Sequence, residues 1–68
     1  MTTGEKIRFF REGKGLRQYE LAELVGYGAQ NQTRISFFEL GKCEPSIKTL
    51  RKIAEVLEVE VSSLIGDE

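Results

Sequence analysis

Apolar residues recur along the chain at intervals of three and four, and no stretch alternates in the manner of a β-strand. This pattern predicts helices over residues 3–14, 18–25, about 32–40, 47–57 and about 60–65. Gly15, Gly26 and Gly41 stand just after the first three segments, where helices commonly end. We therefore expect an all-α fold, a compact five-helix bundle that forms one domain over residues 1–68.

Polar residues that favour helix starts precede three of these segments. Thr2 and Glu5 have the spacing of a capping box, Asn31 stands before the third segment, and Ser46 stands before the fourth. Arg17 occupies the corresponding position before the second segment, so we expect no capping side chain there and an added positive charge.

The inward faces of these helices supply the expected core. Ala22 is the small residue at which two helices can cross closely. The apolar residues expected to point inward are Ile7, Phe10, Leu21, Leu24, Val25, Ile35, Phe38, Ile47, Leu50, Ile53, Ala54 and Leu57, with Val61, Leu64 and Ile65 in the last segment.

Composition narrows the possible functions. The chain has 68 residues, one cysteine and no histidine, so we expect neither an internal disulfide nor a Cys/His metal site. No serine or cysteine has a histidine base, no glycine-rich phosphate loop is present, and Glu20 and Glu23 suit a solvated helix face. We expect no enzyme activity, no cofactor and no small-molecule ligand, and a cytoplasmic protein without a signal peptide or membrane span.

Charge is segregated along the sequence although the net charge is only -1. Residues 1–52 hold all ten Lys and Arg residues and six Glu, a charge of +4, whereas residues 53–68 hold five acids and no base, a charge of -5. This distribution fits one surface that faces a polyanion and another that serves a different purpose, or a chance arrangement of solvated charges.

A polar run precedes the third helical segment. Two helices joined by a glycine-containing turn suggest a helix-turn-helix, in which the second helix projects its first residues into a DNA major groove. Gln32 can then bond adenine, and Thr33 can meet a base edge or a thymine methyl, while Ile35 points to the core. The other interpretation, an ordinary polar helix start, is equally compatible with these residues.

Three sequence motifs carry a resemblance to a known family. They are G-L-x-Q-x-x-L-A over residues 15–22, I-S-x-x-E-x-G over 35–41 and L-x-x-I-A-x-x-L-x-V over 50–59, together with Arg11, Gly26 and Pro45. Over about residues 5–66 the chain resembles the Cro/C1-type (XRE-family) helix-turn-helix regulators. The resemblance implies the lambda-repressor-like DNA-binding fold.

The resemblance also implies roles for individual residues. Gln18 would reach a phosphate and support the recognition helix, and Lys42 would touch the DNA backbone from a loop. Arg11 and Glu39 would form a structural pair that ties the first helix to the third, rather than contact DNA directly. The base-reading start of the third helix would consist of Gln32, Thr33 and Arg34.

The chain departs from the family pattern in three places, and these departures leave undecided which residues contact the bases. Seven residues separate Tyr27 from Ile35, where the family usually has four, so Gln30 or Asn31 could replace Gln32 at the base edges. Phe37 occupies a position that is often polar, and it either packs on a thymine methyl or covers the longer turn. Arg17 adds a charge near the expected DNA backbone.

The function that follows is a sequence-specific regulator of transcription, a repressor that binds double-stranded DNA at a two-fold operator as a homodimer. The dimer seam is expected near the acidic end, at Val59, Val61, Leu64 and Ile65. The alternative is a protein-interaction module of the same fold, such as an antitoxin component or an accessory factor. Cys43, a lone loop thiol, either acts as a redox switch or has no role.

Overall fold

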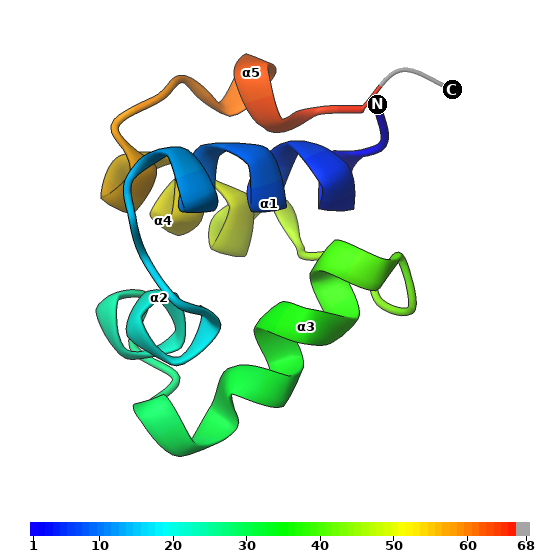
Figure 1. Cartoon of the computed structure of the whole chain (residues 1–68). Helices are drawn as coiled ribbons and strands as arrows, with labels where there is room; N and C mark the ends of the chain where they lie inside the picture. The colour runs from blue at the N-terminus through cyan, green and yellow to red at the C-terminus, as the bar shows by residue number, and fades with distance from the viewer. Residues whose placement is uncertain (67–68) are drawn as a thin grey trace.

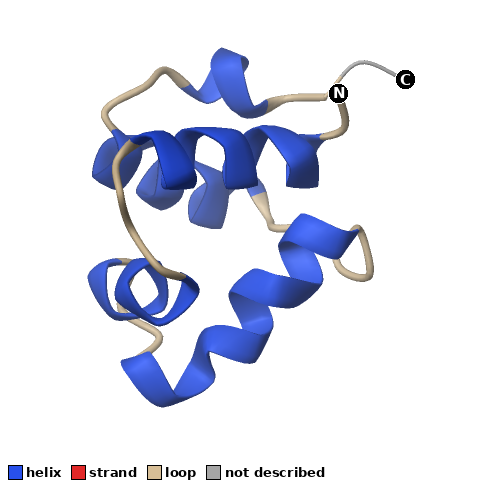
Figure 2. Cartoon of the chain, viewed as in Figure 1, coloured by secondary structure: helices blue, strands red, loops and turns tan. Residues whose placement is uncertain are grey.

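The computed structural model describes residues 1–66, and this range contains five α-helices and one short 3-10 helix (Figure 1). The elements in chain order are α1 (Thr3–Gly13), α2 (Gln18–Leu24), η1 (Ala29–Asn31), α3 (Gln32–Leu40), α4 (Ile47–Leu57) and α5 (Val61–Leu64). No strand occurs within residues 1–66 (Figure 2). The prediction of an all-α bundle is confirmed, and the five α-helices begin and end within one residue of the expected bounds.

The helix ends follow the capping chemistry of the sequence. At the start of α1, Thr2 Oγ1 accepts the backbone N–H of Glu5 at 3.1 Å, and the Glu5 carboxylate accepts the N–H of Thr2 at 2.8 Å. At the start of α4, Ser46 Oγ accepts the N–H of Thr49 at 3.2 Å. The helix α3 ends at Gly41, whose φ of +79° is a left-handed conformation that glycine adopts without a steric penalty.

The helices pack around one core. In Figure 1, α2 and α3 lie on one side of α1 and α5 lies on the other, with α4 behind α1 in that view. The buried apolar residues are Ile7, Leu21, Ala22, Val25, Ile35, Phe38, Leu50, Ile53, Ala54, Leu57 and Leu64. No helix in the described part of the chain has the length and apolar character needed to cross a membrane.

Three residues expected in the core lie at the surface: Leu24, Ile47 and Ile65, the last of which is 49% exposed after the end of α5. Leu24 is 56% exposed, because the short helix α2 already fills its narrow inward side with Leu21, Ala22 and Val25. Ile47 is 55% exposed, because it is the first residue of α4 and the buried stripe of that helix begins one turn later, at Leu50.

The two ends of the described chain are joined. The N–H of Gly66 donates to Thr3 Oγ1 at 2.8 Å, and Lys6 Nζ donates to the carbonyl of Ile65 at 2.9 Å. These bonds hold the segment after α5 against the start of α1 (Figure 1).

Gly4 marks a close approach between α1 and α3. A Cβ atom at Gly4 would lie 2.7 Å from the carbonyl oxygen of Glu39 and would also overlap the carbonyl oxygen of Phe38. Both neighbours are backbone atoms, so neither can move without shifting α3. Glycine is therefore required at this crossing for the observed placement of α3 against α1.

We expect Gly4→Ala to lower the free energy of unfolding by about 1–3 kcal/mol, the usual cost of inserting atoms into a packed interface. The matched control is Gly13→Ala in the same helix, where an added Cβ meets nothing within 4 Å. This control should leave the stability unchanged or raise it by about 0.5–1 kcal/mol. Urea denaturation measures both variants, and equal stability of the two would contradict the close approach.

Candidate nucleic-acid interface

A buried ion pair joins α1 to α3. Arg11 Nε lies 2.6 Å from Glu39 Oε2, and Arg11 Nη2 donates to Glu39 Oε1 at 3.1 Å, so the contact is bidentate. Arg11 Nη1 also donates to the backbone carbonyl of Leu16 at 2.7 Å. Gln18 Nε2, at the start of α2, donates to the same carboxylate at 3.0 Å. The structure thus brings together the pair that the resemblance implied and adds Gln18 to it.

This network fixes which side of α3 faces outward. Ile35, Phe38 and Glu39 are buried, and in an α-helix each residue is rotated by about 100° from the one before. Thr33, Phe37 and Leu40 consequently form the outward row, and all three are exposed. Gln32 is also exposed and lies on the flank nearer Glu39. The expected reading residues Gln32 and Thr33 therefore stand at the surface.

The leading end of α3 is longer than the sequence pattern suggested. The residues of the extended turn form the 3-10 turn η1, which runs directly into α3. The prediction that the Asn31 side chain caps α3 is wrong, because Asn31 Nδ2 turns back and donates to the carbonyl of Tyr27 at 2.6 Å. Gln30 is exposed, and its side chain lies against Gly28, whose φ of +92° allows the turn. The tip thus presents Gln30 and part of Asn31.

Two cations near α3 lie over aromatic rings. The guanidinium carbon of Arg34 is 4.2 Å from the centre of the Tyr27 ring, and Lys42 Nζ is 5.9 Å from the centre of the Phe37 ring. Phe37 is 40% exposed. Its ring therefore lies partly in contact with Lys42 and partly open to solvent.

Arg17, a third cation near this surface, lies directly before α2. Its backbone N–H donates to the Glu20 carboxylate at 2.7 Å, and its side chain makes no capping hydrogen bond, as expected for arginine at this position. The guanidinium is exposed at the residue directly before Gln18. Arg17 is thus free to meet an anion beside the network that holds α3.

Comparison with known proteins relates this geometry to a family. A helix-turn-helix family model matches residues 7–64. The chain belongs to the helix-turn-helix family. In the terms of this family, α2 is the first helix of the motif and α3 is the second, the recognition helix.

Three curated relatives support the same assignment. One is an uncharacterized HTH-type transcriptional regulator, YonR, derived from the SPβ prophage of Bacillus subtilis (strain 168). The two sequences are 34% identical over a match that covers 91% of this chain and 55% of the length of YonR. Another is the immunity repressor protein of Bacillus phage phi105, 31% identical over 100% of this chain and 45% of its own. A third, an uncharacterized HTH-type transcriptional regulator of Archaeoglobus fulgidus, is 39% identical over 87% of this chain and 80% of its own.

The chain spans about half the length of the first two of these relatives. No solved structure matches it significantly.

The charges of this helix-turn-helix protein are unevenly neutralised. Arg8 pairs with Glu12 on α1, and Lys14 pairs with Glu58, which lowers the pKa of the Glu58 carboxyl by hydrogen bonding and by Coulombic attraction. By contrast, no ion pair within residues 1–66 engages Arg17, Arg34 or Lys42. Lys6, Lys48, Arg51 and Lys52 are likewise in no ion pair within this range, so unpaired cations lie on α1 and α4 as well as around the recognition helix.

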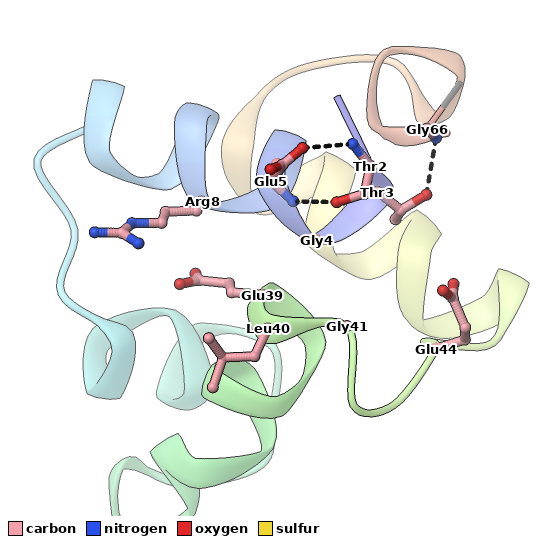
Figure 3. Close-up of a pocket in the computed structure, with 10 residues that line it drawn as sticks. All are labelled: Thr2, Thr3, Gly4, Glu5, Arg8, Glu39, Leu40, Gly41, Glu44 and Gly66. Atoms are coloured by element: carbon pink, nitrogen blue, oxygen red, sulfur yellow. Dashed lines mark hydrogen bonds between the residues drawn. The ribbon is translucent and has the colours of Figure 1, made fainter. Parts of the chain in front are cut away.

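A hollow of about 710 Å³ lies elsewhere, where the start of α1 meets the end of α3 (Figure 3). The capping pair Thr2 and Glu5 and the bond from Gly66 to Thr3 form part of its wall. Glu5, Glu39 and Glu44 carry negative charge there and Arg8 carries a positive charge, a balance that disfavours a polyanion. The hollow adjoins the C-terminal end of α3, where Leu40 lines it, and its lining includes no residue of α2 or of the leading end of α3.

Only some of the residues expected at a dimer seam have exposed surface that could contact a second chain. Leu64 is fully buried in its own chain, which confirms its predicted place in the core, and the prediction that it also contributes to the seam is therefore wrong. Val59 and Val61 are partly buried against the core, and Ile65 is 49% exposed. Cys43 is exposed in the loop between α3 and α4, and nothing in its surroundings assigns it a role.

Sequence reasoning missed two residues that bear on this interface. Leu40 is 64% exposed and belongs to the outward row of α3, which its spacing of seven residues from Thr33 could have revealed. Tyr27 supports Arg34, and no pattern along the chain indicates this contact, because the path of the extended turn decides it.

The buried pair generates a stability prediction. Glu39→Gln removes the buried counter-charge of the Arg11 guanidinium and leaves it only a 3.8 Å contact with the exposed Glu12 carboxylate, so we expect the free energy of unfolding to fall by about 3–5 kcal/mol. Glu23→Gln removes the same charge from an exposed residue of α2 and should change the stability by less than about 0.5 kcal/mol. Chemical denaturation followed by circular dichroism compares the two, and similar stabilities would mean that the pair does not hold α3.

Proposed function

We propose that this chain is a sequence-specific, double-stranded DNA-binding transcriptional regulator that acts as a repressor, with α3 in the major groove. The observation that carries the proposal is the exposed leading end of α3, where Gln32 and Thr33 have no partner within the described chain. The phi105 relative is named an immunity repressor, which supports the repressor role. The proposed role is binding, not catalysis, and the proposed location is the cytoplasm.

The outward side chains of α3 suit base edges. The Gln32 amide offers a donor and an acceptor that match adenine N6 and N7, and Thr33 can accept, donate or present its methyl group. Phe37 can pack on a thymine methyl beyond Thr33 in the same row. Gln30 and Asn31, at the tip formed by η1, extend the reading surface toward the groove floor.

The cations on either side of α3 suit the DNA backbone. Arg17 lies at the start of α2, and Lys42 lies in the loop just after α3. Gln18 shares its amide with Glu39, so its proposed contact with a phosphate would fix the network and the DNA together. Phosphate contacts of this kind orient the protein and supply affinity that does not depend on sequence.

Selection from a random duplex pool, performed with the unaltered chain, tests the proposal directly. A recovered consensus with two-fold symmetry and half-sites about 34–36 Å apart supports it. If instead no duplex is enriched, and binding to any DNA shows no steep salt dependence, the protein-interaction module becomes the better account. The exposed apolar pair Phe37 and Leu40 favours that alternative over an inert surface.

Replacing the reading residues should separate specificity from affinity. We expect Gln32→Ala with Thr33→Ala to reduce the preference for the selected site by about 1–3 kcal/mol for each lost base contact, without unfolding the chain. The comparison is Lys42→Ala, which should weaken binding to all duplexes alike and reduce the log–log salt slope by about 0.9. Binding titrations at several salt concentrations measure both effects, and retained preference in the double variant contradicts the assignment.

We also propose that the chain binds as a homodimer through Val59, Val61 and Ile65. Ile65→Lys introduces a charge on this patch and should shift the sedimentation of the protein, alone or on its operator, toward one chain. Leu24→Lys is the matched control, because Leu24 is exposed to a similar degree on α2. A parent chain that stays monomeric on DNA as well as in solution argues against this seam.

A further inference from the structure

The ring of Tyr27 is held from several sides. Tyr27 begins the extended turn and is partly buried against the core, with its ring centre 6.4 Å from that of Phe38. Its hydroxyl lies 3.4 Å from Thr49 Oγ1 on α4, and its backbone carbonyl accepts the Asn31 amide. A ring fixed in this way is a rigid surface between α2, α3 and α4.

Arg34 lies on this ring and has its hydrogen-bond donors free. The distance of 4.2 Å from the guanidinium carbon to the ring centre is that of a close cation–π contact. No carboxylate or carbonyl in residues 1–66 accepts a hydrogen bond from the Arg34 side chain. Because a ring supports a guanidinium through its face, the N–H groups at the edge of the guanidinium stay available to a ligand.

The direction of Arg34 differs from that of the base-reading row. Arg34 is rotated by about 100° from Thr33 around α3, toward the side of Phe38 and α4. There it lines a groove of about 310 Å³ with Tyr27, Phe37, Ser46, Thr49 and the acidic residue Glu44. Within residues 1–66 Glu44 forms no ion pair with Arg34, so it does not take up the guanidinium donors. The guanidinium is thus placed at the flank of α3, beside the start of α4, rather than at the crest of the helix.

We propose that Tyr27 is a positioning residue that holds the Arg34 guanidinium on the flank of α3 for a phosphate oxygen of the DNA backbone. This inference rests on the proposed function and refines it, because the family resemblance places Arg34 among the base-reading residues. Rotation alone does not separate the two residues, because Gln32 is rotated from Thr33 by the same angle toward the opposite flank. The contact with the Tyr27 ring in the groove beside α4 assigns Arg34 to the backbone and leaves Gln32 and Thr33 to the bases. The phosphate chemistry fits, since guanidinium and phosphate form charge-assisted hydrogen bonds that carry no sequence information.

A double-mutant cycle tests this assignment with the duplex recovered by selection and with a random-sequence duplex. The four chains are the parent, Tyr27→Leu, Arg34→Ala and the double variant, and Tyr27→Phe serves as the control that keeps the ring. We expect Tyr27→Leu to weaken binding by about two- to fivefold, the range of an exposed cation–π contact, and Tyr27→Phe to bind like the parent. In the Arg34→Ala background, Tyr27→Leu should have no further effect.

The cycle separates positioning from general destabilisation, because a loss of folded protein would weaken binding equally in both backgrounds. Equal weakening in the two backgrounds overturns the role of Tyr27. For Arg34→Ala, the phosphate assignment requires a uniform loss on both duplexes and a salt slope reduced by about 0.9. A loss confined to one base-pair position overturns it in favour of base reading.

A measurement on the free protein distinguishes failure of this inference from failure of the proposed function. The side-chain NMR signals of Arg34 should be shifted by the ring current in the parent and in Tyr27→Phe, and should return to ordinary values in Tyr27→Leu. A parent that shows this shift but binds no duplex overturns the proposed function and the phosphate contact together. A parent that binds DNA without the shift overturns the positioning role alone.

Discussion

The orientation of α3 depends on the buried pair of Arg11 and Glu39. Apolar side chains point in both directions from this helix, since Ile35 and Phe38 face the core whereas Phe37 and Leu40 face solvent. Hydrophobic burial alone would therefore favour several rotations of α3 to a similar extent. A carboxylate that must meet a buried guanidinium from α1 restricts the helix to one rotation, because any other would leave a buried charge without its partner. The main effect of the pair is thus to select one packing arrangement of α3 over the others.

The same network links the two helices of the motif. Gln18 donates from the first turn of α2 to the carboxylate that Arg11 already holds, and Arg11 reaches the carbonyl of Leu16 in the preceding loop. Within residues 1–66 no buried side-chain nitrogen or oxygen lacks a hydrogen-bond partner. A satisfied polar network in a small core resists deformation, so the surface formed by α2 and α3 is largely preformed. Preformed geometry favours binding because less conformational entropy is lost when a partner docks.

Much of the fold was predictable from local chemistry. The helix bounds followed from apolar residues spaced three and four positions apart, from the Thr2 and Ser46 caps, and from glycines at the helix ends. The errors concern features that only three-dimensional packing decides: Leu24 has helical spacing but lies on a helix too short to bury it, and Leu64 looked available yet fills the core. At the interface, the exposure of Gln32 and Thr33 agreed with the sequence pattern, whereas the path of residues 28–31 had no periodic signal to reveal it.

The geometry of that path explains how a longer turn can keep the motif intact. A 3-10 helix has about three residues per turn and rises about 2 Å per residue, so three added residues make nearly one full turn and lengthen the leading end by about 6 Å. One full turn leaves the rotation of the following residues unchanged, and Ile35 and Glu39 can therefore still reach the core. The lengthening instead moves Gln30 and Asn31 to the tip. Tyr27 lies before the helical segment, next to Gly28 with its φ of +92°, so the path of the turn, and not a helical repeat, places the Tyr27 ring against the Arg34 guanidinium. The extension thus reshapes the reading end without disturbing the Arg11–Glu39 pair that supports α3.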